Sequence, residues 1–110
     1  MGVNSLGANT TGSNNVALGE NTLKDNTTGE NITAVGYFAL EKNTADDNTA
    51  IGYYALNANT SGQSNVAVGK RALDVNTTGG SNTAIGKNAL GANTTGTANF
   101  AGGTLSLIHI

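Results

Sequence analysis

The chain has no cysteine and little charge, and each shortage excludes classes of function. Without cysteine it can form neither a disulfide framework nor a thiolate metal site. Five Lys and Arg against seven Asp and Glu give a net charge of −2, so the chain lacks the basic stripe that nucleic-acid phosphates require. No apolar run approaches the roughly 20 residues that span a bilayer. We therefore expect no nucleic-acid partner and no membrane insertion by this segment.

Large side chains are also scarce. Aromatic residues make up 5% of the chain and charged residues 11%, while Asn, Thr, Ala and Gly dominate. Such a composition cannot fill a conventional globular core, and on composition alone it would suit a disordered chain. The strict spacing of the Val, Ile and Leu residues argues against disorder.

A short pattern recurs about six times. It reads Asn-Thr-Ala-(Ile/Val/Leu)-Gly, two variable residues, Ala-Leu, two variable residues and Asn-Thr-Thr-Gly. The aliphatic-Gly pair recurs at steps of 17, 16, 17 and 17 residues, beginning at Leu18-Gly19. A unit this short cannot bury a core alone and must stack on its neighbours. The sequence therefore predicts an all-β, parallel β-solenoid (β-roll) of about six coils of 16 to 17 residues.

Each coil is expected to begin with a short strand and to turn at glycine. In Val66-Ala67-Val68 and its equivalents the two outer residues share one face, because side chains alternate along a strand. We predict that Val16, Leu18, Leu23 and their equivalents lie inside. The corner glycines are Gly19, Gly36, Gly52, Gly69, Gly86 and Gly103.

A column of alanines lies between the residues that are expected to point inward. An ordinary solvated strand face would carry Lys, Glu or Thr there, so a uniform Ala suggests the close approach of another layer. That layer is either a neighbouring segment of the same coil or a partner chain of a symmetric fibre. The column consists of Ala17, Ala34, Ala50, Ala67, Ala84 and Ala101.

Asparagine recurs at two positions of the unit. Stacked at the strand spacing of about 4.8 Å, each amide can donate to one neighbour and accept from the other. We predict a structural ladder that includes Asn26, Asn43, Asn59, Asn76 and Asn93. The second expected column is Asn14, Asn31, Asn48, Asn65, Asn82 and Asn99.

Catalytic chemistry is not indicated. The seven carboxylates fall mostly in variable positions, where solvated surface charge explains them, and no nucleophile stands with a base. Asp46-Asp47 replaces a corner glycine in the one shortened unit. We predict no enzyme, no catalytic or metal site, and no cofactor.

Both ends depart from the repeat. Met1 occupies the aliphatic position of a coil already under way, so we expect the natural start upstream. Residues 105–110, Leu-Ser-Leu-Ile-His-Ile, resemble a translated sequencing-library adapter, so His109 should carry no function. We expect a repeat region over residues 1–104 and a foreign or unstructured tail over 105–110.

The run Asn-Thr-Ala-Ile-Gly-x-x-Ala-Leu, at residues 48–56 and 82–90, resembles the head repeats of trimeric autotransporter adhesins. It is also similar to repeats of phage tail fibres. The resemblance covers about residues 2–104 and implies a left-handed roll, three chains to a head, at the cell surface, outside the cell or on a virion. The longer period and the Asn-Thr-Thr-Gly corner depart from the adhesin pattern.

The two residues after each corner glycine vary while the frame stays fixed. Stacking would align them along one edge, with four aromatics beside basic residues, a combination that suits a surface glycan or a host receptor. The alternative is that the aromatics only cover the thin core or pack in a trimer. The candidate surface-binding residues are Tyr37, Phe38, Tyr53, Tyr54, Lys70, Arg71 and Lys87.

These observations predict a structural and adhesive segment of a surface or virion fibre, assembled as a homotrimer, which attaches to a host or another surface. The alternative is an ice-binding or other Thr-rich solenoid. Its weakness is that the repeated Thr pairs lie at corners, with no Thr-x-Thr on a strand face.

Overall fold

A computed structural model describes residues 1–104 of the chain, so the predictions for the tail 105–110 lie outside the described residues. Six three-residue strands recur along it: β1 (Val16–Leu18), β2 (Thr33–Val35), β3 (Thr49–Ile51), β4 (Val66–Val68), β5 (Thr83–Ile85) and β6 (Phe100–Gly102). Turns and bends connect them. No helix in the described part is long and apolar enough to cross a membrane.

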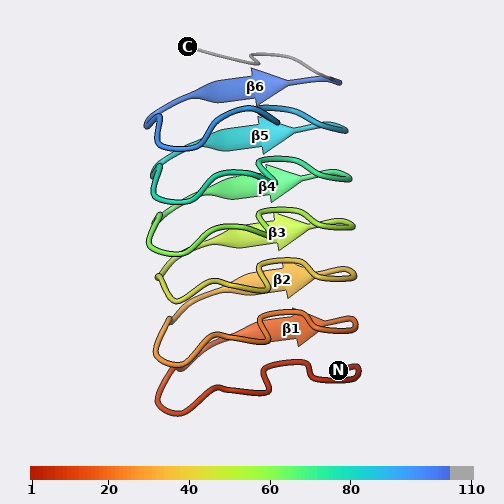
Figure 1. Ribbon diagram of the computed structural model, residues 1–110, viewed down its shortest axis with the longest axis vertical. Helices are drawn as coiled ribbons and strands as arrows, with labels where there is room; N and C mark the ends of the chain where they lie inside the picture. The colour runs from red at the N-terminus through yellow and green to blue at the C-terminus, as the bar shows by residue number, and fades with distance from the viewer. Residues whose placement is uncertain (105–110) are drawn as a thin grey trace.

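The strands form one parallel sheet in chain order, with one strand from each coil. Figure 1 shows the coils stacked along a single axis, and the molecule measures 35 × 20 × 17 Å. Each strand residue pairs with its equivalent in the next repeat, as Ala17 does with Ala34 and Ala34 with Ala50. The predicted β-solenoid is confirmed.

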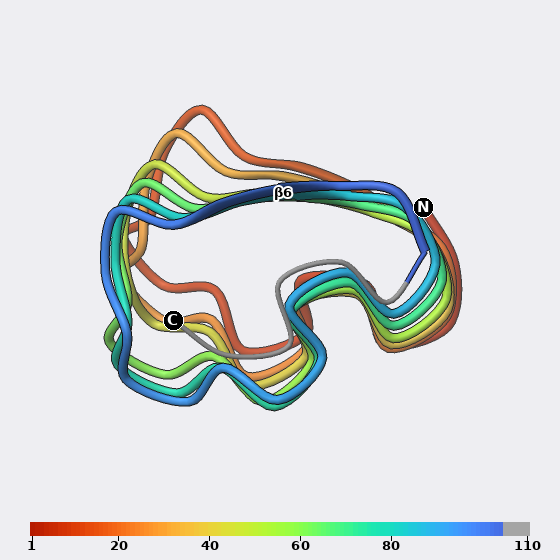
Figure 2. The same ribbon diagram turned by 90° about the horizontal axis from the view of Figure 1, so that it is seen from above.

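The core is a narrow stripe between two walls of the coil. Viewed along the axis, the wall opposite the strands is indented toward the sheet (Figure 2). One leucine from that wall is fully buried in each central coil. These leucines are Leu23, Leu40, Leu56, Leu73 and Leu90.

The predicted orientation of the strands is wrong. The central alanine of every strand is buried, whereas Val16, Leu18 and Ile51 are 55, 49 and 40% exposed. The opposite wall fills the interior with its leucines and leaves room for only a methyl group on the strand side. Because side chains alternate, Val, Ile and Thr therefore point outward. The close layer behind the alanines is the same coil and not a partner chain.

The buried leucines have an unusual backbone. Each adopts a left-handed conformation, with φ between 50° and 53° in Leu23, Leu40, Leu56, Leu73 and Leu90. For an L-residue this conformation costs roughly 1–2 kcal/mol. Full burial of a leucine contributes about 1.5–3 kcal/mol, so burial offsets the strain. The repeated strain bends the wall inward and narrows the core.

The corner after each strand requires glycine. Gly52 has φ 134°, and a Cβ there would lie 2.7 Å from the backbone carbon and oxygen of Gly69 in the next coil. Real side chains do not tolerate such an approach to backbone atoms. The glycine therefore sets how closely successive coils can stack.

The first asparagine column forms hydrogen bonds between coils. The Asn76 amide donates to Asn59 Oδ1 at 2.9 Å, and Asn93 donates to Asn76 Oδ1 at 2.8 Å. Asn59 donates to Asn43 Oδ1 at 2.7 Å. Each of these amides also donates to a backbone carbonyl of its own coil, such as Gly79 O for Asn76. The side chains therefore close the corner and join the coils at once.

The second asparagine column differs from the expected one at its start. The residues that precede the strands are Asn15, Ile32, Asn48, Asn65, Asn82 and Asn99. Asn14 and Asn31 lie one position earlier, where the backbone is left-handed, with φ 59° and 57°. In this column the side-chain oxygen of Asn65 accepts the backbone N–H of Asn82 at 3.0 Å. Counting the period in fixed steps missed the one-residue deletion near Asp47.

The first stability prediction compares an inward with an outward position of the coil. Changing Leu56 to Asp places a charge in the stripe and should lower the unfolding free energy by roughly 4 kcal/mol or more. Changing Ile51 to Asp should cost about 1 kcal/mol or less, since its side chain is outside. Thermal unfolding of dilute protein, followed by circular dichroism, measures both. Equal losses in the two variants would contradict the orientation.

The second stability prediction concerns the first asparagine column. Asn76→Ala removes three hydrogen bonds and leaves buried partners unsatisfied, at a cost of about 3 kcal/mol. Asn57→Ala makes the same chemical change at a half-buried position outside the column and should cost less than about 1 kcal/mol. Chemical denaturation of both variants provides the comparison. If the two variants were equally stable, the asparagine column would contribute no special stability to the fold.

Candidate functional site

Side chains from four successive coils form one exposed edge, which we call the aromatic ridge. Its members follow the corner glycines, and backbone hydrogen bonds fix their alignment. The Tyr54 N–H donates to Tyr37 O at 2.9 Å, and the Arg71 N–H donates to Tyr53 O at 2.8 Å. The ridge consists of Glu20, Asn21, Tyr37, Phe38, Tyr53, Tyr54, Lys70 and Arg71.

The four aromatic rings of the ridge are stacked in two files. Tyr37 and Tyr53 are nearly parallel, with ring centroids 5.5 Å apart, and Phe38 and Tyr54 are nearly parallel at 5.2 Å. Within each coil, neighbouring rings lie at 4.5 Å and are steeply inclined. Stacking covers ring faces, so the ridge presents mainly ring edges and tyrosine hydroxyl groups.

Two cations cover the C-terminal end of the rings. Arg71 lies over Tyr54 at 5.0 Å and over Tyr53 at 5.7 Å, and Lys70 Nζ lies 5.6 Å from the centre of the Tyr53 ring. Such contacts are worth about 0.5–1 kcal/mol at exposed sites. Arg71 also pairs with Asp74 at 3.2 Å. Lys87 follows Lys70 in the same column and lies beyond the aromatic stack.

The backbone of the ridge gives independent evidence that these side chains matter. The second residue of each pair is left-handed, a conformation that Asn tolerates better than other non-glycine residues. Asn occupies this position at Asn4, Asn21 and Asn88, whereas Phe38, Tyr54 and Arg71 have φ of 58°, 57° and 59°. A bulky residue in this conformation goes against the preference of the backbone. Its presence points to a role for the side chain.

The electrostatics of the ridge are uneven along the axis. Exclusion of water by the neighbouring groups raises the pKa of the Tyr37 phenol, and the negative charge of Glu20 raises it further. Glu20 lies at the N-terminal end of the ridge, and Lys70 and Arg71 at its C-terminal end. The neutral phenol therefore persists into more alkaline solution than usual.

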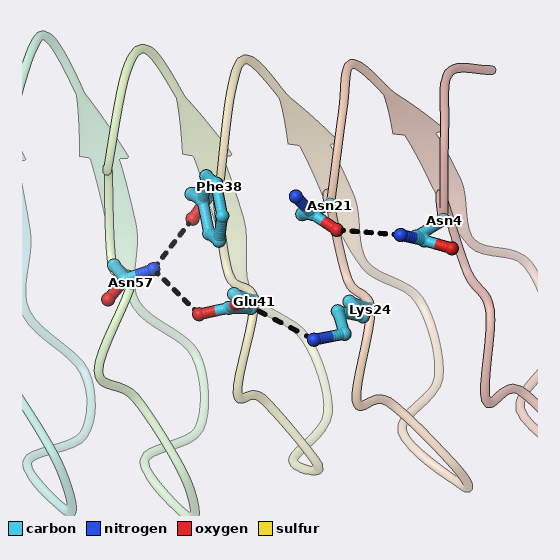
Figure 3. A network of polar contacts seen from close by, with 6 residues as sticks. All are labelled: Asn4, Asn21, Lys24, Phe38, Glu41 and Asn57. Atoms are coloured by element: carbon cyan, nitrogen blue, oxygen red, sulfur yellow. Dashed lines mark hydrogen bonds and ion pairs between the residues drawn. The ribbon is translucent and has the colours of Figure 1, made fainter.

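A polar network supports the flank of the ridge (Figure 3). The Asn57 side chain donates to Phe38 O at 3.0 Å and to Glu41 Oε1 at 3.4 Å. Glu41 also approaches Lys24 Nζ at 4.0 Å, and Asn4 donates to Asn21 at 3.2 Å. These contacts hold the backbone beneath the aromatic files, while the exposed ion pair itself contributes little.

A second candidate surface, the sheet face, is the outward side of β1 to β6. Sequence reasoning missed it because it placed the larger apolar residues inside. The available signal was uniformity: the strand centre is always Ala, whereas its neighbours vary. The sheet face consists of Val16, Thr33, Thr49, Val66, Thr83 and Phe100 in one column and Leu18, Val35, Ile51, Val68 and Ile85 in the other, and carries no charge.

Metal-binding clusters are not found in the described part of the chain: no three His, Cys, Asp or Glu side chains are placed to hold an ion. No protein family, curated protein or solved structure matches the chain.

The raised pKa of Tyr37 gives a prediction for the ridge. We expect its phenol to ionise at higher pH than a free tyrosine, and Glu20→Gln should lower its pKa only in part, because exclusion of water is the larger cause. Ultraviolet titration of a variant with Tyr53 and Tyr54 changed to Phe isolates the signal. A full return to the ordinary pKa on removing Glu20 would contradict this ranking of causes.

Proposed function

We propose that this chain is a structural and adhesive segment of a surface or virion fibre, in which several copies associate through the sheet face. The observation that carries this proposal is the exposure of apolar side chains along the sheet. Val16, Leu18 and Ile85 are 55, 49 and 46% exposed, and aliphatic residues occupy every position of the second column from β1 to β5. Continuous apolar surfaces of this kind mark interaction sites.

A further copy of the chain is the partner that fits this surface best. The sheet face is uncharged, so it offers nothing to a charged ligand. Its two columns repeat once per coil, so a second copy presents the same side chains at the same spacing. The resemblance to trimeric adhesin heads supports three copies around one axis. The ridge, on another edge of the coil, then remains the surface for attachment.

Ice binding is the second candidate, because the outward orientation of the strands places threonines on the sheet face. Thr33, Thr49 and Thr83 lie on the sheet face beside Val35, Ile51 and Ile85, and Val66 takes the position between Thr49 and Thr83. An ice-binding surface requires a regular flat array of threonines, which this column provides in three of its six strands. The same face cannot serve both functions, since association between copies would cover it.

The proposal predicts that one charge on the sheet face dissociates the assembly. Ile51→Asp should dissociate the trimer in sedimentation, because three carboxylates would be buried without partners. Val75→Asp is the matched control: Val75 is 39% exposed, Ile51 is 40% exposed, and Val75 lies outside the sheet. It should leave the trimer intact.

Two results would oppose the proposal. A wild-type chain that is monomeric at every concentration would remove its basis. Thermal hysteresis of that monomer, lost in Ile51→Asp and kept in Val75→Asp, would assign the sheet face to ice.

A further inference from the structure

The charge along the aromatic ridge follows a simple order. Across the four coils of the ridge, the first residue after the corner glycine is Glu20, then Tyr37, Tyr53 and Lys70, and all four are exposed. The uncharged Val3 precedes this run, and Lys87 continues its positive end. The column therefore runs from a negative end through two aromatic residues to a positive end. Backbone hydrogen bonds from Phe38 to Glu20 and from Tyr54 to Tyr37 place these residues in successive coils.

The order of charges on one copy of the ridge complements that on a second copy that runs in the opposite direction. A two-fold axis between Tyr37 and Tyr53, perpendicular to the solenoid axis, would bring Glu20 of one copy level with Lys70 of the other. The two tyrosines would exchange places, so aromatic residues would meet aromatic residues. A parallel arrangement in register would instead place Glu20 against Glu20 and Lys70 against Lys70, which opposes association.

The neighbouring columns favour the same direction. In the second column of the ridge, the reversal sets Asn21 level with Arg71 and Phe38 level with Tyr54. The position after each buried leucine carries Lys24, Glu41, Asn57 and Asp74 in these four coils. Reversal brings Lys24 level with Asp74 and Glu41 level with Asn57, although Lys24 and Asp74 also have ion-pair partners within their own chain.

The stacking of the rings narrows the choice of partner. A sugar would bind face-on to an exposed ring, but the faces between Tyr37 and Tyr53 and between Phe38 and Tyr54 are turned toward each other. Arg71 and Lys70 cover the next face. What remains is a strip of ring edges and hydroxyl groups, together with the outer faces of Tyr37 and Phe38 on the side of Glu20 and Asn21. This strip, with opposite charges at its ends, suits a protein surface of the same composition.

We propose that the aromatic ridge pairs with the aromatic ridge of a second copy that runs in the opposite direction. This isologous contact goes beyond the proposed association through the sheet face. It involves another edge of the coil and can join two separate assemblies. The pairing is held by the meeting of the aromatic strips, and the charges at the ends select its direction.

Charge reversal provides the test. Glu20→Lys and Lys70→Glu are made in the full chain that also carries Ile51→Asp, so the sheet face does not contribute. Each single reversal places like charges at both ends of a homotypic pair and should weaken self-association about tenfold or more, measured by sedimentation. A mixture of the two variants restores both contacts, and its affinity should return to within about threefold of the parent.

The control variants exchange charge elsewhere on the coil. Glu30→Lys and Lys42→Glu change exposed residues outside the ridge and should leave self-association unchanged. A chain with both Glu20→Lys and Lys70→Glu should again associate with itself, which shows that the single variants fail through charge and not through misfolding.

Three results would overturn the pairing. The first is a mixture that associates no better than its components. The second is a doubly reversed chain that stays monomeric. The third is binding of dextran sulfate that Glu20→Lys strengthens and Lys70→Glu removes, with no rescue on mixing, which would assign the ridge to a polyanion. If the Ile51→Asp chain kept the oligomeric state of the wild-type chain, that result would contradict only the proposed association through the sheet face.

Discussion

The narrowness of the coil interior governs the rest of this structure. Between the two walls there is room for one leucine and the methyl groups of two alanines at each central level, and Ile32 is the one other large apolar side chain that is fully buried among residues 1–104. Such a core contributes little on its own, so hydrogen bonding between coils must contribute much of the stability. The asparagine columns and the backbone bonds at every level meet this need. The glycine corner makes it possible, because it lets the coils approach closely.

The fold could be predicted from the sequence because the short, regular period of the repeat permits few topologies. A unit of 16 to 17 residues with one short strand has few ways to bury anything except by stacking. The leucine positions could also be predicted, since a leucine recurs at the same position of every unit while its neighbours vary. The strand orientation could not, because alternation gives two possible faces and hydrophobicity favoured the wrong one. The orientation depends on the space between the two walls of the coil. That space in turn depends on the left-handed backbone of the leucines, which no sequence pattern indicates.

The candidate surfaces differ in how far they could be predicted. The ridge residues could be grouped from the repeat alone, because every residue after a corner glycine must lie on the same edge. The sequence could not predict that the rings stack face to face and so turn their edges outward. The sheet face was hidden by the error in orientation. The positions that are the same in every repeat maintain the coil. The positions that vary lie on the surfaces that can contact other molecules.

The one-residue deletion at Ala45 to Asp47 has a mechanical consequence. At that level both asparagine columns are interrupted: Asn26 Oδ1 is buried without a partner among residues 1–104, and Ile32 takes the place of an asparagine. Asp46 and Asp47 compensate only in part, by accepting from the Glu30 N–H and from the Asn31 amide. In a one-dimensional stack, the weakest junction decides where the array parts. Under tension along its axis, this solenoid would separate first between β2 and β3, and the two blocks on either side would yield later.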